Sequence, residues 1–371
     1  MKYKECTRCV MDTTAKNIVF DENGLCNFCI DYLNRHHERT VTKQGKIDEL
    51  IEAVKRSGKG KKYDCIVGVS GGVDSSYALH LAVKLGLRPL AVHMDNGWNS
   101  ELATNNIHNL VKGLGVDLYT HVVEWNEYKD LMNSFFKANV IDIELLYDNA
   151  MLAVNYQQTK KYGLKYMLFG QNTSTEGISM PQGWNWFKLD KKNIYNIQKK
   201  FGKVQIKTLP TIGTFEYKYL QKIKKFQHVP FLDYFDYNKQ EALDLLITKY
   251  NYKPYPYKHY ESIFTRFYQG YILPKKFGVD KRRPHLSALV ASNQMSKDEA
   301  SKMLSNLPYD ENQLEEDIEY FLKKMEWTKE RLDSYLKEPE VLHSIYGTEK
   351  DSFYKISKKY VQLKKVLSGK K

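Results

Sequence analysis

A short glycine-containing segment, Ser70-Gly-Gly-Val-Asp-Ser75, combines residue types and spacing that could do chemistry. Gly71 and Gly72 let a backbone approach an anion closely and present successive N–H groups to it. A helix that starts here would add the positive end of its dipole, and the two serines can donate hydroxyl hydrogen bonds. The segment has neither the lysine of a GxxxxGK[ST] loop nor a GxGxxG pattern. It therefore predicts a phosphate site that is neither a Walker-type clamp nor a dinucleotide site.

Four of the five cysteines lie in the first 29 residues, as two CxxC pairs that are 16 residues apart. Each CxxC turn can present two thiolates to one tetrahedral ion, so the spacing predicts a zinc ribbon or knuckle. An iron–sulfur cluster would use the same ligands, and four free thiols are a further alternative. A closed four-thiolate site leaves no coordination position for a substrate, which predicts a structural role. The candidate ligands are Cys6, Cys9, Cys26 and Cys29.

Two further polar segments come directly after predicted buried strands. The first follows a strand at 89–94, and the second, Gly170-Gln-Asn-Thr-Ser-Thr-Glu-Gly177, follows a strand at 166–169. The carboxyl ends of parallel strands meet at one edge of a sheet, so both segments should face the Ser70 loop. They offer ligands for a phosphate, a metal, a ribose or an acceptor. The candidates are Met94, Asp95, Gly170, Asn172 and Glu176.

A second concentration of chemistry-bearing side chains lies in the last third of the chain. Segment 257–270 predicts a helix with polar groups among aromatics, which ends at Gly270 and Pro274. Segment 277–287 places three cations and a histidine in one turn before a new helix, which suits a diphosphate. A solvated basic turn is the alternative. The candidates are Lys258, His259, Glu261, Arg266, Lys281, Arg282, Arg283 and His285.

The order of predicted elements sets the fold class. A strand, a helix and a strand between residues 64 and 94 form a βαβ unit, so we expect a parallel sheet. Other helices are predicted at 46–56, 128–139, 141–162, 238–250, 310–324 and 328–336, and another strand at 229–234. The expected fold is α/β, with a PP-type loop in a parallel-sheet core, an N-terminal zinc module and a mostly helical C-terminal region. We divide the chain at 1–45, 46–235 and 236–371.

Length and charge limit the functional classes. A chain of 371 residues exceeds one ordinary single-core domain. The net charge of +13 favours polyanionic partners such as tRNA, a nucleotide-linked substrate or an anionic membrane face. The lysines are scattered, however, and a lysine-rich surface without a specific partner fits equally well. The sequence has no signal-peptide pattern and no apolar run of about 18 residues, so we expect a cytoplasmic protein without a membrane span.

The segment Ser70–Ser75 resembles the pyrophosphate loop of the PP-loop ATPases, also called ATP pyrophosphatases, position by position. These enzymes adenylate an acceptor oxygen, release pyrophosphate, and let a nitrogen or sulfur nucleophile displace AMP. The resemblance implies ATP and Mg²⁺ as cofactors, with Asp74 near the metal and an adenine contact at the end of the second strand. The implied nucleotide-binding residues are Ser70, Gly71, Gly72, Val73, Asp74, Ser75, Met94, Asp95, Gly170 and Asn172.

The Cys-Thr-Arg-Cys-Val-Met start, the loop and the Lys258-His-Tyr-Glu and Asp280-Lys-Arg-Arg blocks together resemble the N-acetyl sugar amidotransferase family, over about residues 1–307. That family is expected to convert an acetamido group on a UDP- or CMP-linked sugar into an acetamidino group, for lipopolysaccharide O-antigen or flagellin glycans. Its ammonia is thought to come from a separate glutaminase and cyclase-like pair, which resembles the imidazole glycerol phosphate synthase subunits. The segment Gln171–Glu176 is less acidic than expected for the family. The implied catalytic residues are Ser70, Asp74, Lys258, His259 and Glu261, and the implied substrate contacts are Glu176, Arg266, Lys281, Arg282, Arg283 and His285.

A tRNA-thiolating PP-loop enzyme with an N-terminal zinc module is the alternative function. Many such enzymes use a cysteine downstream of the loop, but no cysteine follows Cys65, which lies in the predicted first strand. A persulfide mechanism therefore lacks its residue, although external sulfide would still serve. We accordingly favour the sugar substrate and expect no nucleic-acid partner. A general base for the amidotransferase could be His259, Glu261 or His285, and the sequence does not choose among them.

Overall fold

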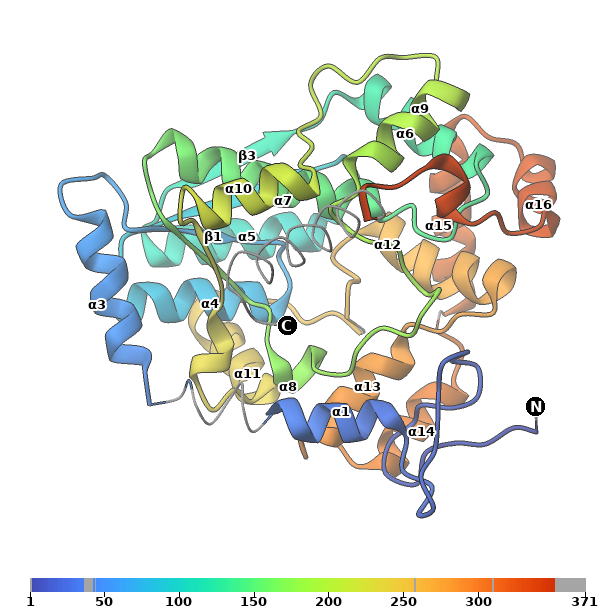
Figure 1. The fold of residues 1–371 in the computed structure, drawn as a ribbon, viewed down its shortest axis with the longest axis horizontal. Helices are drawn as coiled ribbons and strands as arrows, with labels where there is room; N and C mark the ends of the chain where they lie inside the picture. The colour runs from blue at the N-terminus through green and yellow to red at the C-terminus, as the bar shows by residue number, and fades with distance from the viewer. Residues whose placement is uncertain (1, 37–42, 44, 257, 309, 351–371) are drawn as a thin grey trace, which may run out of the picture.

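The computed structural model describes residues 2–36, 43, 45–256, 258–308 and 310–350. Its centre is a five-stranded sheet in the order β3-β2-β1-β4-β5, and every neighbouring pair is parallel. Figure 1 shows helices packed around this sheet. The chain moves from β1 to one edge and then returns to the other side of β1, so the topological switch point lies between β1 and β4. The predicted parallel α/β class is confirmed. The strands are β1 (Cys65–Gly68), β2 (Pro89–Asp95), β3 (Leu118–Val122), β4 (Tyr166–Phe169) and β5 (Gln227–Pro230).

Helices cover both faces of this sheet. The helices up to residue 250 are α1 (Asn27–His36), α3 (Ile47–Gly58), α4 (Val73–Lys84), α5 (Glu101–Leu114), α6 (Trp125–Lys137), α7 (Leu145–Lys161), α8 (Thr173–Glu176), α9 (Lys191–Phe201), α10 (Thr214–Lys222) and α11 (Lys239–Tyr250). Cys65 and Val67 of β1 pack in one apolar cluster with α4 and α11, whereas Ile66 packs in another with α7. Successive side chains of a strand point to opposite faces, so this short strand supplies two cores.

The first βαβ unit follows the prediction closely, and so do the helices expected at 128–139 and 141–162 and the strand expected at 166–169. Other elements differ from the prediction. Helix α5 and strand β3 were not predicted. Strand β3 is an edge strand in which Val122 is 66% exposed, so it lacks the apolar pattern that identifies a buried strand. The strand predicted at 229–234 is shifted, because β5 ends at Pro230 and the chain continues as the 3₁₀ helix η2 (Phe231–Tyr234).

The C-terminal region is helical as predicted, but the helix expected at 257–270 is wrong. Ser262 caps a short helix, α12 (Ile263–Phe267), by accepting the N–H of Thr265. The chain then continues as the π-helix η3 (Tyr268–Phe277), which runs through Gly270 and Pro274 instead of ending there. The remaining helices are α13 (Arg282–Ala291), α14 (Lys297–Ser305), α15 (Glu311–Met325), α16 (Lys329–Lys337) and the 3₁₀ helix η4 (His343–Tyr346).

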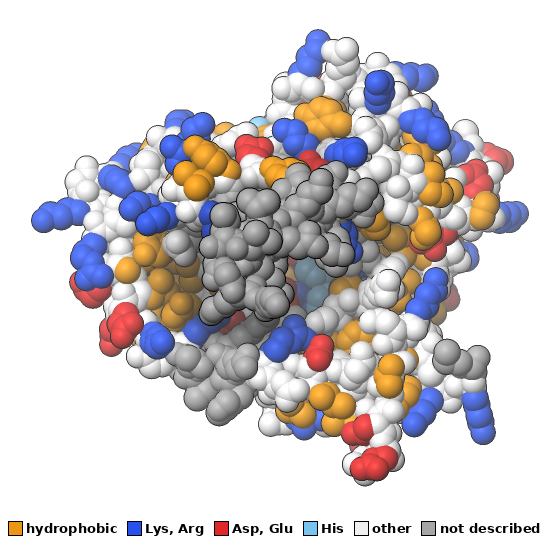
Figure 2. Space-filling view, in the orientation of Figure 1, with side chains coloured by type: hydrophobic (Ala, Val, Ile, Leu, Met, Phe, Trp, Pro, Cys, Tyr) orange, Lys and Arg blue, Asp and Glu red, His pale blue; other side chains and the backbone are white. Residues whose placement is uncertain are grey.

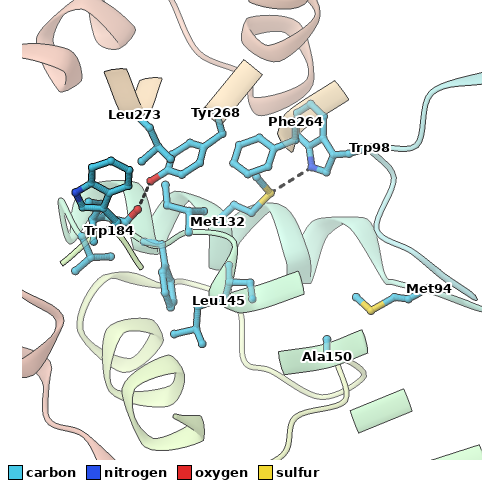
Figure 3. Packing of buried hydrophobic residues seen from close by; sticks show 14 of the residues in the cluster. Met94, Trp98, Met132, Leu145, Ala150, Trp184, Phe264, Tyr268 and Leu273 are labelled. Carbon is cyan, nitrogen blue, oxygen red and sulfur yellow. Dashed lines mark hydrogen bonds between the residues drawn. The ribbon is translucent and has the colours of Figure 1, made fainter. Parts of the chain in front are cut away.

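An aromatic core fixes the C-terminal helices to the α/β domain. The fully buried Trp98, from the loop after β2, donates its indole N–H to the sulfur of Met132 at 3.3 Å and packs beside Phe264 of α12 (Figure 3). The hydroxyl of Tyr268 donates to the carbonyl of Ile141 at 2.6 Å. Segment 258–285 is therefore held rigidly against the carboxyl edge of the sheet. Within the described residues, no helix combines the length and apolar character needed to cross a bilayer.

Candidate active site and metal centre

The loop between β1 and α4 has the geometry of an anion cradle. Gly71 has a φ of +89°, and a Cβ there would lie 3.3 Å from the carbonyl oxygen of Ala103. Gly72 is the N-cap of α4 and has no side chain to engage the first N–H groups, which leaves them for a ligand. The hydroxyls of Tyr252 and Tyr255 donate to the Gly71 carbonyl at 2.8 and 3.3 Å, which fixes the loop from outside.

The serines and Gly170 complete this loop. Ser70 Oγ lies 3.2 Å from Ser75 Oγ, which donates to the Gly72 carbonyl at 3.1 Å. A Cβ on Gly170 would fall 2.5 Å from the backbone of Asp74, so only glycine lets the end of β4 approach the loop this closely. The loop and Gly170 thus meet at the switch point, where ligands of open parallel sheets bind.

Asp74, in the first turn of α4, is contacted by groups from three other segments. Tyr237 donates its hydroxyl to Oδ1, while Thr175 Oγ1 and Lys258 Nζ each lie 3.3 Å from Oδ2. Burial raises the pKa of Asp74, but the charges of Lys258 and Lys239 and the bond from Tyr237 outweigh it and hold the pKa below its usual value. Asp74 is therefore a carboxylate at neutral pH.

Glu176 lies near Asp74 because Asn172 fixes α8, the short helix that ends at Glu176. The side chain of Asn172 caps α8 by accepting the N–H of Thr175 at 2.8 Å, and Asn172 is 3% exposed. This buried hydrogen bond fixes the start of α8. Lys258 Nζ lies 2.6 Å from Glu176 Oε1. Magnesium is typically held by one or two carboxylates together with substrate phosphates. Asp74 and Glu176 fit that pattern, and the Lys258 ammonium between them stands in for a cation.

Two histidines and a glutamate lie above the loop. His259 Nδ1 is 3.8 Å from Glu261 Oε1, and a Cβ on Gly72 would be 3.3 Å from that oxygen. The ring of His285 is centred 5.3 Å from that of His259. Burial, together with the neighbouring charges of Lys258 and others, lowers the pKa of His285 well below its usual range, so this ring stays neutral. The structure brings the predicted His259, Glu261 and His285 together.

Two of the predicted substrate cations are already paired with buried carboxylates. Lys281 is 7% exposed, and its Nζ lies 2.6 Å from Glu144 Oε2. Gln269 donates to the same carboxylate at 2.8 Å. Arg266 forms a bidentate pair with Asp317, at 2.6 Å for both contacts. Lys281 and Arg266 line the cavity, but their charges are neutralised by the protein itself.

The other two predicted cations serve local structure. Arg282 pairs with Asp280 at 2.8 Å and also donates to carbonyls at the end of α14. Arg283 points to the N-terminal module, where it lies 3.0 Å from Asp12 Oδ2 and donates to the carbonyl of Val10 at 2.7 Å. Arg283 is not among the residues that line the cavity. The three cations do not converge on one point, and their role as diphosphate ligands stays a prediction.

The adenine contact expected at the end of β2 is not exposed in this structure. Met94 is 1% exposed, and Asp95 accepts the N–H of Gly97 at 2.8 Å. Neither residue lines the cavity. An isolated bridge joins Asn99 to Ser262, so the C-terminal segment lies over this end of β2. The adenine contact therefore stays a prediction.

A cavity of about 880 Å³ extends from the loop to the C-terminal region. Histidine side chains are visible at the bottom of a hollow near the centre of the face in Figure 2. The volume is close to the upper end for small-molecule sites, so it can take more than a single nucleotide. Besides the predicted residues, its lining includes side chains that the sequence analysis did not single out, among them Tyr147, Asp148, Thr175, Lys188, His228 and Lys239.

Lys239 differs from the other cations of the cavity. It is the first residue of α11, and among the described residues no carboxylate is close enough to pair with its ammonium. Burial lowers its pKa, and the charge of Asp74 only partly counteracts this. An unpaired cation in such a cavity favours a bound anion. In the sequence, the capping residue Asn238 indicates that a helix begins at this point. No residue spacing indicates that this end of the helix faces the Ser70–Ser75 loop.

The four N-terminal cysteines form a compact, buried cluster. Their sulfurs lie within 4.8 Å of one another, with 3.9 Å between Cys6 and Cys29 and 3.8 Å between Cys9 and Cys26. A tetrahedral zinc with Zn–S bonds of about 2.3 Å would hold its sulfurs about 3.8 Å apart. Backbone N–H groups also point at the sulfurs, as from Met11 to Cys9 at 3.4 Å, which suits thiolates. The cluster could therefore bind zinc.

Family models match two separate parts of the chain. A model described as NAD synthase matches residues 45–176, and one described as "LPS biosynthesis protein WbpG-like, C-terminal domain" matches residues 261–361. Uncharacterized protein MJ1599 of Methanocaldococcus jannaschii is 29% identical over 168 residues, which cover 45% of this chain and 58% of that protein. The chain thus spans little more than half of this curated relative.

Solved structures with partial likeness include three nucleotide- or tRNA-related proteins. NMN synthetase from Francisella tularensis is 16% identical, with a TM-score of 0.28 over 62% of this chain and 99% of that one. NH3-dependent NAD synthetase from Campylobacter jejuni is 15% identical, with a TM-score of 0.28 over 56% and 93%. U34-tRNA thiolase NcsA from Methanococcus maripaludis is 13% identical, with a TM-score of 0.34 over 82% and 90%. Scores this low support no functional statement.

The family models and the fold agree with each other. Residues 45–176 contain the loop, β1 to β4 and α8, while residues from 261 onward contain Glu261, α12 and α13. The chain therefore combines an NAD synthase-like PP-loop domain, which indicates an ATP-dependent enzyme, with a WbpG-like C-terminal domain.

Proposed function

We propose that this protein is an ATP-dependent amidotransferase that converts the acetamido group of a nucleotide-linked N-acetyl sugar into an acetamidino group. One observation carries the proposal: a single cavity joins the pyrophosphate loop to the His259, Glu261 and His285 side chains from the C-terminal region. The match of that region to an LPS biosynthesis family supports a surface-polysaccharide substrate such as an O-antigen precursor. Formation of the amidine itself is the part that experiment must test.

The first step is adenylation of the acceptor. An amide oxygen is a poor leaving group, so the acetamido oxygen attacks the α-phosphorus of ATP and pyrophosphate departs. Negative charge develops on the departing pyrophosphate. In this proposal that charge is stabilised by the loop N–H groups, the hydroxyls of Ser70 and Ser75 and the ammonium of Lys239. Asp74 and Glu176 would hold Mg²⁺, which supplies charge neutralisation at the phosphates. The product is an O-adenylylated imidate that keeps the N–H proton of the amide and therefore carries a positive charge on nitrogen.

The second step replaces the activated oxygen with nitrogen. Ammonia attacks the imidate carbon, AMP leaves with the oxygen, and the protonated amidine remains. The incoming nitrogen must lose a proton, and we propose that His259, oriented by Glu261 at 3.8 Å, accepts it. His285 is a poor proton acceptor because its pKa lies far below the usual value, and it serves better as a neutral hydrogen-bond donor to the acceptor.

Two further assignments belong to this proposal. We assign zinc to the cysteine cluster, because a four-iron cluster binds each thiolate to a different iron and would spread the sulfurs further apart.

We also propose that ammonia comes from a separate glutaminase and cyclase-like pair. All five cysteines are buried: four form the metal cluster, and Cys65 lies in β1. None is free to act as a glutaminase nucleophile in the cavity or to carry the persulfide of a persulfide-based tRNA thiolation.

The test is incubation with ATP, Mg²⁺, ammonium and UDP- or CMP-linked N-acetyl sugars. AMP and pyrophosphate should appear only when sugar and ammonia are both present, and mass spectrometry should show a loss of about one dalton per converted acetamido group. Asp74→Asn should abolish turnover, while Asp236→Asn, which alters an exposed carboxylate outside the cavity, should leave it unchanged. Release of AMP that depends on unmodified tRNA, without sugar conversion, would overturn the proposal.

A further inference from the structure

The ammonium of Lys258 lies between two carboxylates that belong to different elements. Its Nζ is 2.6 Å from Glu176 Oε1 of α8 and 3.3 Å from Asp74 Oδ2 of α4. The side chains of Lys258 and Asp74 are only 17% and 15% exposed, so the pair is largely withdrawn from water. Thr175 adds its hydroxyl 3.3 Å from Asp74 Oδ2. A cation is therefore required at this point, and the chain supplies one itself.

The same oxygens are suited to a divalent ion. Mg²⁺ takes one or two carboxylates, completes its shell with phosphate oxygens and waters, and gives up water reluctantly. A divalent ion bound to both carboxylates would face the Lys258 ammonium at close range, where the repulsion between like charges is strong. The ammonium and the metal ion therefore exclude each other from this position.

We propose that Lys258 is an internal substitute for the divalent cation. Its ammonium occupies the Asp74–Glu176 site in the nucleotide-free enzyme and leaves that site when the metal arrives with ATP. The proposal rests on the proposed use of ATP, but not on the identity of the acceptor. Once displaced, the ammonium remains beside the loop, where the phosphates of the nucleotide are its new partners. Metal binding and nucleotide binding are then coupled, and the metal alone binds weakly.

In the proposed exchange only the side chain of Lys258 moves, and contacts on either side of it hold neighbouring residues in place. On one side, Tyr255 is bonded to the Gly71 carbonyl at 3.3 Å. On the other side, Ser100 donates its backbone N–H to the Glu261 carbonyl at 3.0 Å. Between these anchors His259 has a φ of +69°, a left-handed conformation that a non-glycine residue holds only when its surroundings enforce it. The long flexible lysine chain is therefore the part that moves.

Manganese binding to the whole protein tests the proposal without sugar or turnover. Mn²⁺ serves as the probe, free ion is followed by electron paramagnetic resonance, and the cysteine cluster is first saturated with zinc. Without nucleotide, Lys258→Met should bind Mn²⁺ at least about tenfold more tightly than the wild type, because the competing charge between the carboxylates is gone. Lys258→Gln is the second variant in case Met disturbs folding.

Two controls separate exchange at the site from a general charge effect. Lys239→Met removes a cation of the same cavity that does not lie between the carboxylates, and it should change Mn²⁺ affinity by less than about threefold. Glu176→Gln combined with Lys258→Met should lose the gain. With a non-hydrolysable ATP analogue, the advantage of Lys258→Met should disappear, since the wild-type lysine has then left the site.

Equal affinities for the wild type and both Lys258 variants would overturn the proposal, as would an equal gain in Lys239→Met. Either failure would leave the amidotransferase activity open to its own test, because no sugar takes part here. Conversely, an enzyme that proved to act on tRNA could still show the predicted Mn²⁺ behaviour. The two proposals therefore fail separately.

Discussion

Two groups of cations flank the candidate active site, and they differ in what neutralises them. The α13 cations, Lys281, Arg282 and Arg283, are paired with Glu144, Asp280 and Asp12, carboxylates that belong to the packed interior or to neighbouring turns. The loop cations are Lys239 and Lys258. Lys258 contacts the two carboxylates suited to a metal, and within the described residues Lys239 has no carboxylate partner.

The comparison shows that the partner of a cation, more than its position near a cavity, decides its role. A cation with a fixed, buried carboxylate contributes to folding, since removing it leaves an uncompensated charge. A cation without such a partner gains most when an anion arrives. The α13 cations should therefore affect stability, and the loop cations should affect ligand binding and turnover.

The largest effect should come from breaking the ion pair of an α13 cation whose carboxylate is fully buried. Arg283→Met leaves Asp12, which is fully buried, without its partner and should lower the free energy of unfolding by about 3–5 kcal/mol. Urea unfolding measures this. The metal content of the purified protein is a second readout, because Arg283 joins α13 to the N-terminal module that carries the four cysteines.

Asp12→Asn added to Arg283→Met provides the control. It removes the stranded charge, so the double variant should recover part of the lost stability. If Arg283→Met alone unfolds within about 1 kcal/mol of the wild type, the structural role of the α13 cations is wrong.

Next in size is the effect of removing the unpaired loop cation. Lys239→Met should lower turnover about 10²–10³-fold, because it removes one preorganised positive charge from the developing pyrophosphate. Stability should fall only slightly, because Lys239 forms no ion pair within the described residues and contributes only at longer range to keeping Asp74 ionised. Lys239→Arg should restore part of the activity. A variant that is less stable but turns over normally would place Lys239 among the structural cations.

The difference between the two groups also marks what sequence can predict. The Ser70–Ser75 loop was predictable because the strand, the glycines and the helix are contiguous, and local spacing then determines the geometry. The cysteine cluster was predictable for the same reason, as two CxxC turns bring four sulfurs within 4.8 Å of one another. In both cases the chemistry is encoded within a few residues of sequence.

The pairing of Lys281 and Arg283 was not predictable, because their partners lie far away in the chain. Arg283 meets Asp12 across 271 positions, and Lys281 meets Glu144 across 137. The helix expected at 257–270 failed for a related reason. Its aromatic pattern suits a helix, but Ser262 restarts the chain as α12 and anchors it to the loop after β2. Tertiary contacts decided both outcomes.

The histidines show the same division between structure and site, with an effect of intermediate size. His343 is 2% exposed and accepts the N–H of Asp142 at 3.2 Å, while its other nitrogen bonds to Asn193 at 2.8 Å. Burial lowers the pKa of His343 to about 4. Its folded pKa thus lies below the unfolded value, so stability is complete above about pH 6.5 and falls as the pH drops toward 4.

From pH 7 to pH 5, this one residue should cost about 2 kcal/mol of unfolding free energy. Urea unfolding at the two pH values should show a loss that is larger in the wild type than in His343→Gln by roughly that amount. An equal loss in both proteins would mean that His343 does not titrate across unfolding in this range.

The smallest effect should come from a partly exposed ion pair on the N-terminal cysteine module. Lys297 of α14 pairs with Glu5 at 3.1 Å, and the two side chains are 32% and 27% exposed. Water already solvates much of both charges, so Lys297→Ala should change the free energy of unfolding by at most about 1 kcal/mol.

Lys297 and Arg283 contact the same module from adjoining helices and differ mainly in the burial of their partners. A loss as large as that of Arg283→Met would show that attachment of the module, and not the stranded charge of Asp12, determines the stability there.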